Sequence, residues 1–282
     1  MEQTEQPKAA GGSPYDVTVA LEFFKSAGEI DSFQAGGTIF SENEKVGRFS
    51  LKRTKMYLLL EGQVNLVANG RFLDMVGPGE IFGEMASLSQ TARSASAMAR
   101  SACRVISLDD KQFLAALQTK PEFALMMMSV IISRLRKSLA QVKQQNGEDG
   151  EAACAESRVF ERKLLNELVQ ELGDEARMRY EKGRVIMQEG QVGVLMYIVL
   201  EGKASISMQG KVIEKIGPGA VFGEMALVEK APRLASALAD TDCSLLAINR
   251  NAFLDLVKTK PQFGMSLLSA IGERARTTTT RI

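Results

Sequence analysis

The sequence predicts an α+β protein built from two tandem β jelly-roll barrels, each flanked by helices that include a C-terminal helix. Two observations carry this prediction. Met56–Arg136 aligns without a gap with Met196–Arg276, and each copy holds short alternating segments that end at glycine-rich turns. The repeat is too long for a solenoid unit, so we expect two copies of one domain.

The strands of each copy are expected before its helices. In the second copy, MYIVLEG (196–202), KASISM (203–208) and KVIEKIGPG (211–219) read as strands that end at Glu-Gly, Gln-Gly and Gly-Pro-Gly turns. Short strands at this spacing are typical of a sandwich or a jelly-roll barrel rather than a parallel sheet.

A helical period takes over from Pro121 in the first copy. Lys120-Pro121 and Lys260-Pro261 are expected to start the terminal helices, because proline suits a first helical turn. The apolar residues then step by three and four, at Leu125, Met128, Ile132, Leu135, Leu139 and Val142. This stripe suits packing on another helix, so the methionines at 126–128 are expected in a helix core rather than a metal site. We expect the two terminal helices to pair, within one chain as a pseudo-dimer or between chains as a homodimer.

The expected organisation is a disordered tail (1–14), a first domain (15–145), a linker (146–157) and a second domain (158–282). The linker is polar and carries two glycines. SRVFERKLLNELVQEL (157–172) should open the second domain, and YDVTVALEFFKSAG (15–28) is its counterpart in the first. The first copy also has a longer, charged stretch before Met56, which we expect to form a hairpin loop.

Composition excludes several classes of function. The 282 residues carry a net charge of +1, which gives no bulk attraction for nucleic acid or acidic lipid. Histidine is absent and the three cysteines lack metal spacing, so we expect no metal site and no enzyme. Cys103 and Cys243 occupy equivalent positions and are expected to be buried thiols. With no long apolar run and no signal peptide at the start, we expect a cytoplasmic protein without a membrane span.

One stretch occurs twice: FGEMASLSQTARSASA (82–97, cassette 1) and FGEMALVEKAPRLASA (222–237, cassette 2). Glycine permits close approach of a ligand, a carboxylate can accept from a sugar hydroxyl, and an arginine fork suits phosphate oxygens. Met-Ala can begin a short helix with free N–H groups. The candidate ligand-binding residues are Gly83, Glu84, Met85, Ala86, Arg93, Ser94 and Ala95 in cassette 1, and Gly223, Glu224, Met225, Ala226, Arg233, Leu234 and Ala235 in cassette 2.

In this strand context each copy resembles the cyclic nucleotide-binding domain family, whose phosphate-binding cassette reads Phe-Gly-Glu-(Leu/Met/Ile)-Ala and then Arg-(Ala/Ser/Thr)-Ala. The family includes kinase regulatory subunits, gated channels and bacterial catabolite-activator-like regulators. The resemblance implies that the glutamates bind the ribose 2′-OH and that the arginines pair with the cyclic phosphate. Backbone N–H groups near Ala86, Ala95, Ala226 and Ala235 would assist.

The residue after the arginine bears on the base. Family members that respond to cGMP often carry a hydroxyl residue there, so Leu234 favours cAMP in domain two, whereas Ser94 leaves domain one open to cGMP. The predicted function is a cyclic nucleotide sensor, with cAMP as the main expected ligand. It would act on an unidentified protein partner by moving the terminal helix against the barrel.

Two further expectations concern the output. Neither a helix-turn-helix nor an inhibitor segment is recognisable, so direct DNA binding is not expected. The alternative to a sensor is an interaction scaffold that keeps the fold without responding to nucleotide.

Overall fold

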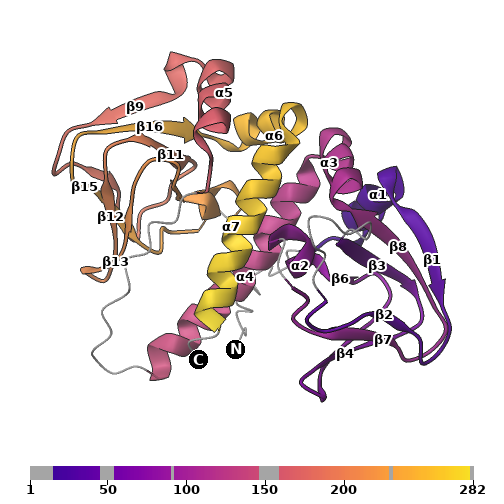
Figure 1. Ribbon diagram of the computed structural model, residues 1–282. Coiled ribbons are helices and arrows are strands. Elements are labelled where there is room, and N and C mark those ends of the chain that lie inside the picture. Colours follow the sequence, from indigo (N-terminus) through magenta and orange to yellow (C-terminus); the bar gives the residue numbers. More distant parts are fainter. Residues whose placement is uncertain (1–14, 45–53, 90–91, 146–158, 229–230, 280–282) are drawn as a thin grey trace, which may run out of the picture.

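The computed structural model describes residues 15–44, 54–89, 92–145, 159–228 and 231–279. Two barrels lie on opposite sides of a pair of long helices that cross the middle of the molecule (Figure 1). The barrel drawn in indigo and magenta is formed by the first copy, and the barrel drawn in orange by the second. The predicted fold class is therefore confirmed.

The first barrel consists of two four-stranded sheets in which every described pairing is antiparallel. One sheet has the order β1-β8-β3-β6 and the other β2-β7-β4-β5. The strands are β1 (Glu29–Phe33), β2 (Thr38–Phe40), β3 (Lys55–Glu61), β4 (Val64–Ala68), β5 (Arg71–Val76), β6 (Ile81–Phe82), β7 (Ser96–Ala99) and β8 (Cys103–Asp109).

The second barrel repeats this topology. Its sheets have the orders β14-β11-β16-β9 and β10-β15-β12-β13, again with antiparallel pairing throughout. The strands are β9 (Arg177–Tyr180), β10 (Val185–Met187), β11 (Met196–Glu201), β12 (Ala204–Met208), β13 (Lys211–Ile216), β14 (Val221–Phe222), β15 (Ser236–Ala239) and β16 (Cys243–Ile248).

Helices flank each barrel in the predicted order. Side chains cap several of them: Asp16 accepts from two backbone N–H groups at the start of α1, and Asp109 forms a capping box with Gln112 on α3. The α-helices are α1 (Val17–Ala27), α2 (Glu84–Ser89), α3 (Asp110–Thr119), α4 (Glu122–Gln145), α5 (Arg162–Leu172), α6 (Arg250–Thr259) and α7 (Pro261–Thr279), and the 3₁₀ turns are η1 (Asp174–Ala176) and η2 (Glu224–Leu227).

The terminal helices α4 and α7 pack against each other within one chain (Figure 1). A single apolar core joins them, with Leu125, Met128 and Ile132 of α4 and Leu267 and Ile271 of α7 all 3% exposed or less. Two further cores fill the barrels. The predicted intramolecular pairing is thus observed, while pairing between chains stays a prediction.

Other predictions have mixed outcomes. Cys103 and Cys243 are buried thiols, as predicted. No helix in the described ranges is long and apolar enough to cross a bilayer. The predicted disordered tail, the linker, the charged hairpin loop of the first copy and Cys154 lie wholly or largely outside the described residues, and so do the side chains of Leu135, Leu139 and Val142.

Candidate functional site

The turn at Gly83 in domain one is shaped to hold an arginine. Gly83 follows β6 with φ of 73°, a left-handed conformation that glycine adopts readily. A Cβ there would lie 2.8 Å from Nη1 of Arg93. The carbonyl oxygen of Gly83 accepts a hydrogen bond of 2.7 Å from that nitrogen, and Lys55 O accepts one of 2.6 Å from Nη2. The turn after β6 and the start of β3 therefore fix the guanidinium.

Arg93 carries a positive charge in a nearly dry environment. The residue is 6% exposed, and its Cζ lies 4.0 Å from the centroid of the Phe40 ring. Burial is the largest influence and lowers the pKa of the guanidinium, while Tyr57, Glu44 and Glu84 act in the opposite direction. Its two carbonyl partners are neutral, so a negatively charged group in the adjoining cavity is favoured.

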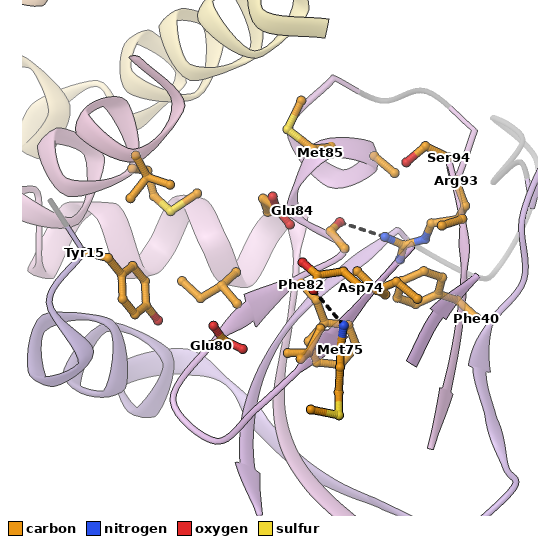
Figure 2. Close-up of a pocket in the computed structure, with 18 residues that line it drawn as sticks. Tyr15, Phe40, Asp74, Met75, Glu80, Phe82, Glu84, Met85, Arg93 and Ser94 are labelled. Atoms are coloured by element: carbon orange, nitrogen blue, oxygen red, sulfur yellow. Dashed lines mark hydrogen bonds between the residues drawn. The ribbon is translucent and has the colours of Figure 1, made fainter. Parts of the chain in front are cut away.

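A cavity of about 540 Å³ opens beside Arg93, within the usual size range of ligand pockets. Its wall includes Glu84 at the start of α2, which is 8% exposed, and the exposed Ser94. Figure 2 shows Glu84 and Arg93 at the same pocket. All seven cassette 1 candidates line it: Gly83, Glu84, Met85, Ala86, Arg93, Ser94 and Ala95.

Other walls of this cavity come from residues that sequence reasoning missed. Met127 and Val130 lie on α4, so the terminal helix itself forms one wall. Tyr15 precedes α1, and its hydroxyl donates a hydrogen bond of 2.6 Å to Gly79 O. Burial, assisted by Glu80, raises the pKa of this phenol well above its usual value. Asp74 enters from β5. Tyr15, Met127 and Val130 lie far from the cassette in sequence, whereas Asp74 lies eight residues before Phe82.

Domain two holds its arginine in the same way. Nη1 of Arg233 donates to Gly223 O at 2.8 Å, and Nη2 donates to Leu195 O at 2.6 Å. Gly223 has φ of 75°, like Gly83. A Cβ on Gly193 would lie 2.5 Å from Arg233 Nη2, so a larger residue there would require the guanidinium to shift. Burial lowers the pKa of this guanidinium too.

The remainder of the second site differs from the first. Glu224 begins a single 3₁₀ turn, η2, where the sequence predicts a short helix. Inside that turn the N–H of Ala226 donates to Gly223 O at 3.1 Å. The cavity has a volume of about 160 Å³, below the usual range for ligand pockets. The cassette 2 candidates line it: Gly223, Glu224, Met225, Ala226, Arg233, Leu234 and Ala235.

Arg274 of α7 lines the second cavity. Its Nη2 donates to Val221 O at 3.0 Å and lies 3.7 Å from Glu214 Oε1, while its Nη1 lies 3.5 Å from Glu224 Oε1. Glu224 is 6% exposed. The carboxylate expected to accept a sugar hydroxyl is thus engaged by the terminal helix of its own domain. The sequence repeat could have drawn attention to Arg274, since it aligns with Arg134 of the first copy without a gap.

Both cassettes touch the central helix pair. In domain one, Met85 packs close to Gly272 of α7. A Cβ added to this glycine would lie 3.6 Å from Cε of Met85. In domain two, Leu227 of η2 belongs to the core shared by α4 and α7. A change at either cavity can therefore reach the helix pair through direct packing.

A statistical model of the family described as "Cyclic nucleotide-binding domain" matches residues 30–120 and 177–260, more than half of the chain. This chain belongs to that family. Its sequence is 26% identical over 236 residues to a cGMP-dependent protein kinase of Toxoplasma gondii and 25% identical over 220 residues to a cAMP-dependent protein kinase regulatory subunit of Eremothecium gossypii. These alignments cover 83% and 78% of this chain but 20% and 43% of the relatives, so it spans less than half of either.

Two solved structures that resemble this chain superpose on it with low TM-scores. The regulatory domain of Toxoplasma gondii PKA with cAMP is 23% identical, with coverage of 90% of this chain and 88% of that one and a TM-score of 0.32. The catabolite activator protein of Thermus thermophilus is 30% identical, with coverage of 40% and 60% and a TM-score of 0.35. At these TM-scores, no role of a residue in this chain is inferred from the superpositions.

Proposed function

We propose that the chain is a cyclic nucleotide sensor in which domain one is the open site. The cyclic phosphate would pair with Arg93, and Glu84 would accept a hydrogen bond from the ribose 2′-OH. One observation supports this most directly. A buried guanidinium, held by two neutral carbonyls, lines the same 540 Å³ cavity as a buried carboxylate.

Domain two would use Arg233 and Glu224 in the same roles, at a smaller site. The 2′-OH would compete with Arg274 for Glu224, since these two side chains are in contact. Leu234 presents no hydrogen-bond donor to a guanine, so cAMP is the ligand proposed for this domain.

The proposed role is regulatory rather than catalytic. Since α4 forms a wall of the first cavity and Arg274 of α7 lines the second, nucleotide binding would shift the helix pair. A protein partner that contacts this pair would then sense the ligand. The domains proposed to act in this way are residues 15–145 and 158–282.

Calorimetric titration with cAMP and with cGMP tests the proposal. We expect heat from at least one nucleotide, with the domain one component lost in Arg93→Ala and the domain two component lost in Arg233→Ala. Arg104→Ala is a matched control. Arg104 forms an exposed ion pair of 2.6 Å with Glu61, and neither residue lines either cavity. Unchanged heats in both cassette variants would refute the assignment of these arginines.

The alternative is a nucleotide-insensitive scaffold, which the small second cavity favours for domain two. It predicts no heat from either nucleotide in protein that unfolds cooperatively. It also predicts no ligand-induced stabilisation, whereas a ligand at about 100 times its Kd should add about 2.7 kcal/mol per site.

A further inference from the structure

Asp74 of β5 is one of three acidic residues that line the first cavity, with Glu80 and Glu84, and it is exposed. It pairs with Leu66 in the β4–β5 register, and both side chains line the pocket. In the view of Figure 2, Asp74 lies between Glu80 and Arg93. Its Oδ1 accepts a hydrogen bond of 2.8 Å from the backbone N–H of Met75, a neutral donor. This donor carries no positive charge to offset the acidic side chain beside the space that a ligand would fill.

The second barrel places a carboxylate at the same register position but uses it differently. Glu214 of β13 pairs with Ile206, as Asp74 pairs with Leu66. Its Oε1 lies 3.7 Å from Nη2 of Arg274, so a cation from the terminal helix partly neutralises it. The two domains thus offer different groups to a base: an anion in domain one and an ion pair in domain two.

A purine edge distinguishes these two environments. Guanine presents two adjacent donors, N1–H and the 2-amino group, which match the two oxygens of a carboxylate. Adenine presents one donor, its 6-amino group, beside the N1 lone pair, which a carboxylate repels. With the phosphate and ribose held by Arg93 and Glu84, the base would lie in the rest of the cavity, whose lining includes Asp74.

We propose that Asp74 is the base-selecting residue of domain one and gives this domain a preference for cGMP over cAMP. The inference rests on the proposed function, because it takes the phosphate and ribose to be held by Arg93 and Glu84. It does not depend on Ser94. The same reasoning gives domain two no guanine preference, since Arg274 occupies Glu214.

The test isolates domain one by working in an Arg233→Ala background. We would titrate cGMP, cAMP and cIMP calorimetrically into this protein and into its Asp74→Asn derivative. The parent should prefer cGMP to cAMP by about 10- to 100-fold, as a lost bidentate pair implies, with cIMP between them because it lacks the 2-amino group. In Asp74→Asn, cGMP should weaken by a similar factor and cAMP should tighten, because an amide can donate to N1 and accept from the 6-amino group.

Controls separate the possible failures. Glu214→Gln in the same background should leave the cGMP-to-cAMP ratio unchanged. If nucleotide binds but Asp74→Asn keeps the parent ratio, or if the parent prefers cAMP, the base assignment is overturned and the proposed function stands. If neither nucleotide binds to this cooperatively folded protein, the base assignment and the domain one part of the proposed function both fall. Should Asp74→Asn not fold, Asp74→Ser serves instead, with the loss of cGMP preference as the readout.

Discussion

Arg274 is predicted to hold domain two closed, so that Arg274→Ala should tighten nucleotide binding there. In the structure its guanidinium lies 3.5 Å from Glu224 Oε1 and 3.0 Å from Val221 O, with a side chain 24% exposed. A nucleotide hydroxyl would compete with Arg274 for Glu224. A charge-assisted contact of this length, partly screened by solvent, contributes about 1–2 kcal/mol. Removing it should therefore lower the Kd of domain two by about 5- to 30-fold.

The assay is a calorimetric titration with cAMP in an Arg93→Ala background, so that only domain two responds. Arg179→Ala, which removes an exposed arginine of β9, is the matched control and should leave the Kd unchanged. Arg274→Ala should also lower the stability of the ligand-free protein, because Glu224 then loses a cationic partner. A Kd that stays the same or rises would refute the reasoning, and a rise would mean that Arg274 serves the ligand instead.

Three further predictions concern single side chains. Tyr15→Phe should lower the free energy of unfolding by about 1 kcal/mol at pH 8. Folding raises the pKa of Tyr15 above its usual value near 10, so the stability that the phenol contributes is complete below pH 10 and is lost as the pH rises further. The difference between Tyr15→Phe and the parent in urea unfolding should therefore shrink by pH 11. Gly272→Ala should stabilise the protein by about 0.5–1 kcal/mol in urea unfolding, since the new Cβ would lie 3.6 Å from Met85 Cε, an ordinary contact, within a helix. Phe40→Leu removes the ring 4.0 Å from Arg93 Cζ and should weaken nucleotide binding to domain one by about 2- to 5-fold in calorimetry, leaving domain two unchanged.

The repeat made much of the fold and both arginine anchors predictable. Two copies of Gly-Glu followed by arginine, in matching strand context, identified residues that the structure places around two cavities. Local sequence rules were enough here because Gly83 and Arg93 are separated by a short loop and bonded directly. The terminal helices followed from their apolar period, and proline at 261 begins α7 as expected.

The remaining walls depend on packing between distant segments, which a periodicity does not specify. Arg274 meets Glu224 across 50 residues, and Tyr15 meets Gly79 across 64. Asp74 was missed for a different reason. A register shift between Leu66 and Val67 interrupts the alternation of β4 against β5, so the sequence pattern alone does not say which β5 side chains face inward.

The pairing of α4 with α7 within one chain also governs how the protein can evolve. In a symmetric homodimer every substitution appears on both sides of the shared contact. Here the two sides are encoded separately, so a change such as a new residue at 272 alters one face while the other stays as it was. Covalent linkage also keeps the halves together on dilution, so ligand concentration rather than protein concentration would set the response. The two domains of such a chain can therefore differ in how readily they bind a ligand, which two identical subunits cannot do.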